Sequence, residues 1–479
     1  MSDPRPDAPG LSLGPRRAAA LARASEHVLH AWTEFDHARE TETPVSPELS
    51  ALLEAPLPEH GTDVLTTIDW AREVLDASMA QSRPRFFGYI GSSGLEVGAL
   101  ADLLAHSYDT NLAVDAGAAT QLESQAVDWL AAFLGFPAGG GTFTSGGTIS
   151  NITALTAARE AALPGSRHHG LGGARPTIYC SLEAHYSIVR AAETLGVGAD
   201  HVRAVGIDEE RALRPDLLRA RLAEDVAAGF TPLAIVATAG TTLTGAVDPI
   251  DPLADLAEEF GVWLHVDGAY GLPAATVAQC APRFAGLARA DSLTVDCHKW
   301  MFVPKACSAV LVRDRRHLAA TFAHDEAYVP HAEERLNAVD LTLEYSRPLR
   351  ALKLWLALAT HGASAMREAV ARNCDQAQLL YDRCAEHEVL ETLAHRPTLS
   401  IVPLRVRVPQ CPDPDAHTAA LCARLQADGR VFVSPATIDG HVWLRPCFTN
   451  FRTRDEDVEA LVTVVLELGA ACAGLHGPA

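Results

Sequence analysis

A lysine that follows a strand-like run is the first residue whose chemistry needs an explanation. Lys299 stands beside His298 in TVDCHKWMF (294–302), directly after the apolar run SLTV (292–295). A lysine is a nucleophile only as the free amine, and burial or a neighbouring cation favours that form. The position therefore suits a lysine that forms a Schiff base with an aldehyde. The alternative is an ordinary surface lysine after a strand.

A carboxylate closes a second apolar run. Asp267 lies in LHVDGAY (264–270), where an unpaired carboxylate would be costly. Pyridoxal phosphate requires a carboxylate against its protonated ring nitrogen, because the charged ring then accepts electrons. Ala269 is small enough for a flat ring to lie close. The alternative is a cap or turn residue, since Gly268 follows.

A glycine-rich stretch, TFTSGGTISN (142–151), opens a helix-like segment. Gly146 and Gly147 allow close backbone approach, and the free N–H groups at a helix start attract a phosphate. Thr148 adds a hydroxyl donor. The stretch is neither a P-loop nor a G-x-G-x-x-G motif, and the alternative is a flexible turn with a helix cap.

A histidine follows another strand-like run: His185 lies in YCSLEAHYS (179–187). An imidazole there can stack on a planar cofactor ring, whereas the alternative is a histidine that hydrogen-bonds the loop backbone. In chain order the four features are a phosphate cradle, a stacking imidazole, a ring-nitrogen carboxylate and a Schiff-base lysine. Each is weak alone, but together they predict a pyridoxal 5'-phosphate site.

Alternating strands and helices must position these residues. Between about 177 and 314, short apolar runs alternate with helical segments, which predicts an α/β fold with a mostly parallel sheet and helices on both faces. Ligands bind such sheets at the carboxyl ends of the strands. We expect a helical arm at 1–85, a large cofactor-binding domain at 86–350, and a long helix with a smaller α+β domain at 351–479. That last domain contains a hairpin with an Asp-Gly turn at 439–440.

Composition limits the possible functions. The 479 residues carry a formal net charge of −21, which argues against nucleic-acid and anionic-membrane partners. No apolar run is long enough for a membrane span, and residues 1–15 lack the apolar core of a signal peptide. The ten cysteines form no C-x-x-C pair, and no histidine stands at zinc-finger spacing. We therefore expect no metal site, free thiols and a cytoplasmic location.

From about 84 to 452 the chain resembles the group II pyridoxal-phosphate amino-acid decarboxylases. That family includes the aromatic amino acid, glutamate, cysteine sulfinate and diaminobutyrate decarboxylases. The resemblance rests on RPRFFGYI, FTSGGTISN, AHYS, TAGTT, LHVDGAY, DCHKW and YSRPLRALKLW. It implies the type I pyridoxal-phosphate fold, as in aspartate aminotransferase, and a homodimer with active sites at the subunit interface.

The resemblance also implies residue roles. Lys299 resembles the Schiff-base lysine, Asp267 the pyridinium partner and His185 the stacking imidazole. The other implied cofactor positions are Gly146, Gly147, Thr148, Thr242, Ala269 and His298. Tyr328, in HDEAYVPH (324–331), matches a loop tyrosine that returns a proton after carbon dioxide leaves, which favours decarboxylation over oxidative aldehyde formation. The alternative is a loop tyrosine on the surface.

Substrate identity is less determined. The candidate pocket residues are Phe86, Phe87, Tyr89, Ile90, Ser92, Asn111 and Lys305, and Arg445 matches an arginine near the substrate carboxylate. A hydrophobic or aromatic L-amino acid is the first expectation. Asp296 and Lys305 depart from aromatic decarboxylases and leave an acidic or diamino substrate, such as glutamate or 2,4-diaminobutyrate, as the alternative. An aminotransferase or oxidative deaminase on the same fold, and a binding protein without cofactor, remain further alternatives.

Overall fold

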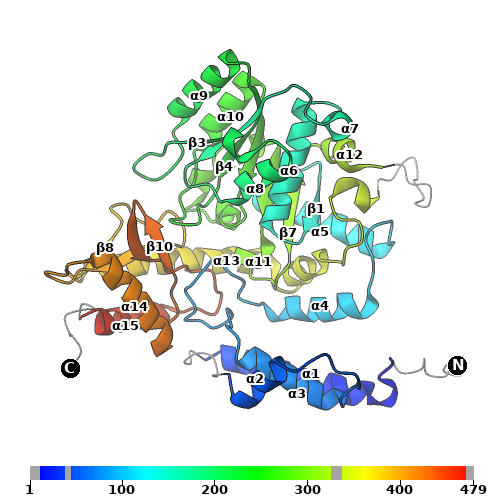
Figure 1. Cartoon of the computed structure of the whole chain (residues 1–479), viewed down its shortest axis with the longest axis vertical. Coiled ribbons are helices and arrows are strands. Elements are labelled where there is room, and N and C mark those ends of the chain that lie inside the picture. The colour runs from blue at the N-terminus through cyan, green and yellow to red at the C-terminus, as the bar shows by residue number, and fades with distance from the viewer. Residues whose placement is uncertain (1–10, 38–44, 325–336, 471–479) are drawn as a thin grey trace, which may run out of the picture.

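The computed structural model of the protein describes residues 11–37, 45–324 and 337–470. Tyr328 therefore lies outside the described residues. The N-terminal arm is a layer of helices, which are η1 Gly14–Arg16, α1 Arg17–Phe35, α2 Pro47–Leu53 and α3 Val64–Asp76 (Figure 1). Helix α3 packs against both α1 and α2, and its contact with α1 is the more extensive.

A seven-stranded sheet forms the centre of the large body, in the order β1-β7-β6-β5-β4-β2-β3. Only β7 is reversed, because it pairs antiparallel with both β1 and β6 while the other neighbours pair in parallel. The strands are β1 Gly140–Thr144, β2 Pro176–Ser181, β3 Val202–Val205, β4 Thr231–Thr238, β5 Trp263–Asp267, β6 Ser292–Val295 and β7 Ser308–Val312. The predicted mostly parallel sheet is confirmed.

Alternation along the strands sends buried side chains to both faces of this sheet. In β4, Ile235 and Ala237 pack in the cluster that contains α5, α9 and α10, whereas Ala234 and Val236 pack in the cluster that contains α6, α8 and α12. The helices of the body are α4 Glu96–Tyr108, α5 Ala118–Leu134, α6 Gly147–Ala162, α7 Ser166–His169, α8 Ser187–Thr194, α9 Pro215–Ala227, α10 Ile250–Phe260, α11 Cys297–Trp300 and α12 Arg316–Phe322. Short 3-10 helices are η2 Ala199–His201, η3 Leu272–Thr276, η4 Ala281–Phe284, η5 Leu287–Arg289 and η6 Ala338–Leu341.

A long helix, α13 (Ala351–Ala385), leads from the body into a smaller α+β lobe, and it bends at Gly362, whose φ is 76°. The lobe contains a four-stranded antiparallel sheet in the order β10-β11-β9-β8. Its elements are β8 Leu390–Thr392, β9 Leu404–Val406, α14 Pro414–Asp428, β10 Pro435–Ile438, β11 His441–Leu444 and α15 Asp455–Gly469. Asp439 and Gly440 both have positive φ, 52° and 80°, as a tight hairpin turn requires, so the predicted hairpin is confirmed.

The segment that precedes α4 is joined to this lobe by backbone hydrogen bonds. The amide of Phe87 donates to the carbonyl of Phe432 (2.8 Å), and the amide of Cys447 donates to the carbonyl of Phe87 (2.9 Å). Phe86 stacks on Phe432 with ring centroids 4.6 Å apart. Phe87 is 1% exposed and meets Phe448 edge-on in the core of the lobe. Residues 86 and 87 thus pack and hydrogen-bond within the C-terminal lobe, more than 300 positions further along the chain.

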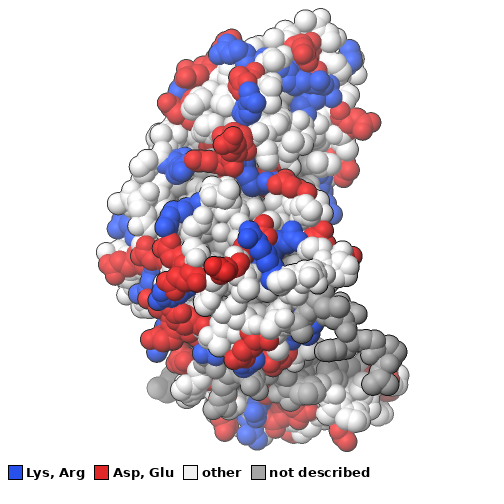
Figure 2. Space-filling view, turned by 90° about the vertical axis from the view of Figure 1, so that its left-hand side faces the viewer, with Lys and Arg blue, Asp and Glu red and all other residues white. Residues whose placement is uncertain are grey.

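Charged residues of both signs are interspersed over the face drawn in Figure 2. Within the described ranges no helix has the length and apolar character needed to cross a membrane. Among the described residues, eight cysteines are free and buried: Cys180, Cys280, Cys297, Cys307, Cys374, Cys384, Cys422 and Cys447. Cys411 is disulfide-bonded, so the expectation of free thiols is wrong for that residue.

Candidate active site

One cavity lies where several strands of the central sheet end. Asp267 is the last residue of β5, Lys299 lies on α11 just after β6, and His185 follows β2. The lining residues are Gly147, Thr148, Asn151, His185, Ser187, Thr238, Gly240, Thr242, Asp267, Ala269, Tyr270, Asp296 and Lys299. The fold thus brings together seven of the predicted catalytic and cofactor-binding residues, which are Gly147, Thr148, His185, Thr242, Asp267, Ala269 and Lys299.

The lysine of the cavity is paired with an aspartate. Nζ of Lys299 lies 3.0 Å from Oδ2 of Asp296, and the Asp296 side chain is only 2% exposed. His298 does not line the cavity, but its Nε2 lies 3.8 Å from the same oxygen. Nδ1 of His298 faces the backbone of Cys307, and burial lowers the pKa of His298, so its imidazole is neutral near pH 7. Lys299 is thus the nearer of the two basic side chains that face Asp296.

The start of α6 forms one wall. The amides of Ile149 and Ser150 donate to the carbonyl of Gly146, whereas those of Gly147 and Thr148 make no hydrogen bond to another described residue. A Cβ atom on Gly147 would lie 2.9 Å from Oδ2 of Asp296 and 3.1 Å from Cβ of Ala269, so a side chain there would displace the Asp296 carboxylate. A Cβ atom on Gly146 would meet nothing within 4 Å, so close approach does not require glycine at that position. Free amides at a helix start are suited to a phosphate.

Asp267 is held by two donors. Its Oδ2 accepts from Nδ2 of Asn151 (2.9 Å), and its Oδ1 accepts from the amide of Ala269 (3.2 Å). Sequence reasoning missed Asn151. A signal was present, because Asn151 lies four residues after Gly147 and therefore on the same face of a helix.

His185 has a defined tautomer. Its Nδ1 accepts from the backbone amide of Ser187 (3.2 Å) and lies 2.9 Å from Oγ of the same residue. Because an amide only donates, Nδ1 carries a lone pair and the proton of the neutral ring is on Nε2. Burial lowers the pKa of His185, which keeps the ring neutral near pH 7.

The predicted substrate residues do not line this cavity within the described chain. Arg445 reaches its edge, since Nη1 donates to the carbonyl of Thr242 (2.8 Å). Ser92 donates to the carbonyl of Val303 (2.8 Å), and Asn111 accepts from the amide of Arg347 (3.2 Å). The remaining candidate pocket residues, which also lie off the lining of the cavity, are Phe86, Phe87, Tyr89, Ile90 and Lys305. Nζ of Lys305 donates to the side chain of Gln81 (2.7 Å).

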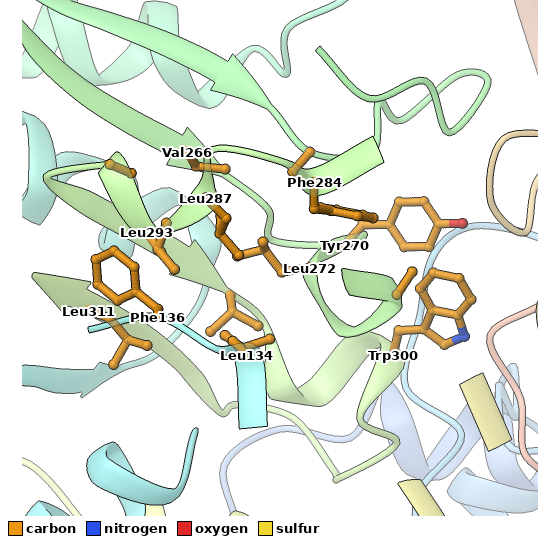
Figure 3. Close-up of a cluster of buried hydrophobic side chains, with 14 of the residues drawn as sticks. Leu134, Phe136, Val266, Tyr270, Leu272, Phe284, Leu287, Leu293, Trp300 and Leu311 are labelled. Atoms are coloured by element: carbon orange, nitrogen blue, oxygen red, sulfur yellow. The ribbon is translucent and has the colours of Figure 1, made fainter. Parts of the chain in front are cut away.

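A stacked aromatic pair supports the floor of the cavity. Tyr270 lines the cavity and stacks on Trp300, the residue after Lys299, with ring centroids 5.0 Å apart and an interplanar angle of 19°. Figure 3 shows both rings at the edge of the hydrophobic cluster that also contains Leu272. The indole of Trp300 donates to Asn373 on α13 (3.0 Å). The core therefore fixes the backbone that carries Lys299.

The donor set fits pyridoxal phosphate. The free amides of α6 suit its phosphate, Asp267 its ring nitrogen and Lys299 its carbonyl carbon. Two buried polar atoms at the cavity, Oγ1 of Thr238 and Oδ1 of Asp296, have no hydrogen-bond partner among the described residues. The α/β fold and this cavity are those of the pyridoxal-phosphate enzymes of fold type I.

Comparison with known proteins narrows this class. Residues 47–407 match the pyridoxal-dependent decarboxylase conserved domain. An aromatic-L-amino-acid decarboxylase of Bacillus atrophaeus is 32% identical over 416 residues, which are 84% of this chain and 85% of the relative. An L-2,4-diaminobutyrate decarboxylase of Rhizobium meliloti is 30% identical over 422 residues, 86% of this chain and 83% of the relative. The crystal structure of mouse CSAD is similar with a TM-score of 0.90 at 25% identity, covering 96% of this chain and 100% of that one.

The chain belongs to the pyridoxal-dependent decarboxylase family. It is a carboxy-lyase that uses pyridoxal phosphate. The family, fold class, cofactor and reaction class expected from the sequence are thereby confirmed.

Proposed function

We propose that this decarboxylase converts a hydrophobic or aromatic L-amino acid to its amine and carbon dioxide. The observation that carries the proposal is the cavity in which Lys299, Asp267 and the start of α6 converge. Pyridoxal phosphate, when bound, accepts the electron pair that carbon dioxide leaves behind. The side chains of the cavity bind and orient the cofactor, and one of them returns a proton to the substrate.

Each residue has a role in the proposal. Lys299 is the covalent anchor, Asp267 holds a proton at the ring nitrogen and His185 lies against the ring. Free amides and hydroxyls at the start of α6 hold the phosphate. The residues proposed to complete the cofactor site are Gly146, Gly147, Thr148, Thr242, Ala269 and His298. His298 acts through the backbone around Lys299, since it lies beside the cavity rather than on its lining.

Two donors are proposed for the proton that replaces carbon dioxide. The first is Tyr328, by its resemblance to the loop tyrosine of the family. The second is Nε2–H of His185, since the contacts of Ser187 leave the ring proton on that atom.

An aromatic face supports the substrate class. Phe86, Tyr89 and Phe432 have ring centroids 4.6–6.3 Å apart, and Tyr89 is 48% exposed. Arg445 is proposed to hold the substrate carboxylate. The remaining proposed substrate residues are Phe87, Ile90, Ser92 and Asn111. The 32% identical relative is named for aromatic L-amino acids.

An acidic or diamino substrate is the second candidate. Lys305 places an amine next to Gln81 near the candidate pocket segment, and a relative at 30% identity is named for 2,4-diaminobutyrate.

We further propose a homodimer. Apolar side chains are exposed on the arm and on α4, and clusters of exposed apolar side chains are uncommon on soluble monomers. The exposed side chains are Leu21, Leu29, Leu75, Leu100, Leu103, Leu104 and Tyr108. A second copy that covers these side chains would also bring residues of its own to the cavity. Such a contribution would complete the site, because the predicted substrate residues of a single chain do not line the cavity within the described residues. The eight buried free thiols support a cytoplasmic location.

A substrate panel tests the proposal. The purified protein, supplied with pyridoxal phosphate, is mixed with each common amino acid and with 2,4-diaminobutyrate, and carbon dioxide, amine, aldehyde and keto acid are measured. We expect carbon dioxide and an equal amount of amine from an aromatic or large apolar amino acid. Turnover of only acidic or diamino substrates would support the second candidate, and keto acid without carbon dioxide would overturn the proposal.

A further inference from the structure

A buried histidine lies behind the cavity and touches none of the groups proposed to react. His265 is on β5, two residues before Asp267, and is fully buried. Trp263, His265 and Asp267 alternate with Leu264 and Val266, so the three lie on one face of the strand and the two apolar residues on the other. A buried imidazole needs partners for both ring nitrogens.

Both nitrogens have partners. Nε2 of His265 lies 3.1 Å from Oδ1 of Asn151, and Nδ1 lies 2.8 Å from Oγ of Ser292. Ser292 is the β6 residue in register with His265, and its Oγ also accepts from the indole N–H of Trp263 (2.8 Å). Oγ1 of Thr294 is a more distant neighbour, 3.4 Å from Nε2.

The directions of these bonds follow from Asp267. A carboxylate accepts only, so the Asn151 atom that faces it is the amide nitrogen, which also donates to Oγ of Ser187 (2.9 Å). Oδ1 of Asn151 then faces His265, whose Nε2 must carry the proton. Burial lowers the pKa of His265 to about 4, so the ring is neutral and Nδ1 accepts from the hydroxyl of Ser292.

We propose that His265 is a positioning residue: it fixes the Asn151 amide so that one NH2 group holds both Asp267 and, through Ser187, His185. The polar chain runs in one direction from the indole of Trp263 to the ring of His185. Loss of the Nε2–H donor leaves Oδ1 of Asn151 unpaired in a buried site. An amide flip would then turn that oxygen toward the Asp267 carboxylate, which repels it. The inference rests on the proposed roles of Asp267 and His185.

The test compares His265→Leu with His265→Gln in the full-length protein. Glutamine can place an N–H donor near the position of Nε2, whereas leucine cannot. We expect His265→Leu to weaken pyridoxal phosphate binding and to lower kcat, each by about 10–100-fold, the range seen when metal ligands lose a supporting hydrogen bond, with little change in KM. His265→Gln should recover most of both losses. Equilibrium dialysis against pyridoxal phosphate gives the dissociation constant without reference to turnover.

Tyr179→Phe is the matched control. Tyr179 is also fully buried in the central sheet, and its hydroxyl donates to Asp225 (2.9 Å), away from the cavity. This variant should lower the melting temperature and leave the dissociation constant and the pH dependence of the cofactor absorption band unchanged. His265→Leu should shift that band or its pH dependence. Equal effects of the two variants on cofactor binding would reduce the role of His265 to ordinary core stability and overturn the inference.

Ser292→Ala covers the case in which His265→Leu does not fold. It keeps the imidazole but removes the donor that fixes its tautomer, so a smaller loss in the same direction is expected. Cofactor affinity and spectrum equal to those of the unchanged protein would overturn the inference. Failure of the unchanged protein to bind pyridoxal phosphate or release carbon dioxide would instead contradict the proposed function, so the two failures are distinguishable.

Discussion

Nζ of Lys299 lies 3.0 Å from Oδ2 of Asp296, and that aspartate borders the same cavity wall as Gly147. Asp296 thus lies between Lys299, the proposed covalent anchor, and Gly147 in the proposed phosphate cradle. The Asp296 side chain therefore contacts the lysine side chain directly. If the phosphate binds at the start of α6 as proposed, the Asp296 carboxylate lies beside it and repels its negative charge.

Asp296→Asn should therefore bind pyridoxal phosphate more tightly, because a negative charge beside the phosphate is removed. We expect roughly a tenfold lower dissociation constant, about 1.4 kcal/mol, measured by equilibrium dialysis. Asp291→Asn, which removes the acid that pairs with Arg313 away from the cavity, is the control and should bind normally. Weaker binding by Asp296→Asn would show that the carboxylate is needed to hold the site together.

Lys299→Ala should abolish turnover, by about 10⁴-fold or more as for loss of other covalent groups. The chain has three lysines, Lys299, Lys305 and Lys353, so the anchor can be located directly. Borohydride reduction of the loaded protein, followed by peptide mass analysis, should find the cofactor on the peptide with Lys299. Lys305→Ala should retain both the label and the absorption band. A label on another lysine would contradict the assignment.

Stability should fall in acid because of His265. Its pKa is 6.5 when unperturbed and about 4 when folded, since burial disfavours the charged ring. Above pH 6.5 neither state is protonated, whereas between 6.5 and 4 the unfolded state binds a proton that the folded state does not. The folded state thus loses about 1.4 kcal/mol per pH unit over that window. Denaturant unfolding measured from pH 7 to pH 4 should show that the free energy of unfolding falls less steeply in His265→Gln than in the unchanged protein. Parallel curves of this free energy against pH for the two proteins would contradict the expectation.

Arg347→Met should destabilise the protein strongly. Arg347 makes a two-pronged pair with Glu123 (2.9 and 2.7 Å), and both side chains are buried. Removing one partner leaves a buried charge alone, so the free energy of unfolding should fall by about 3–5 kcal/mol. The double variant Arg347→Met/Glu123→Leu should recover much of it. Arg316→Met, in an exposed pair with Asp314, should change little in the same urea titration.

Leu103→Glu tests the proposed dimer. Leu103 lies on α4 and is 50% exposed, so a charge there costs nothing in a monomer but opposes burial against a second copy. Sedimentation velocity should show a shift from dimer to monomer with loss of activity. Leu217→Glu, an exposed leucine on α9, should leave the dimer intact. A monomeric unchanged protein with full activity would contradict the dimer.

Sequence reasoning placed Asp267 and Lys299 correctly near the ends of strands, because the rule for parallel sheets applies to each strand separately. It could not supply the bond from Asn151 to Asp267, since 116 positions separate the two residues and only packing of α6 on β5 brings them together. The pairing of Lys299 with Asp296 was equally hidden, although only three positions apart, because it depends on the short helix after β6.

Strand β1 was missed for a different reason. Gly140 and Gly141 are weak strand formers, so local propensity does not predict a strand there. In the sheet, a Cβ atom on Gly141 would lie 2.5 Å from the carbonyl oxygen of Val310 on β7. Glycine is required there by contact with a partner strand far along the chain, which local propensity does not describe.

The joining of residues near Phe87 to the C-terminal lobe has a consequence for synthesis of the chain. The amide of Tyr89 donates to Ser434 across 345 positions. At about 5–20 residues per second, a ribosome needs roughly 17–70 s to make the intervening chain. During that interval the partners of Phe86 and Phe87, which are Phe432 and Cys447, have not yet been made, so the nascent protein exposes an aromatic segment suited to chaperone binding.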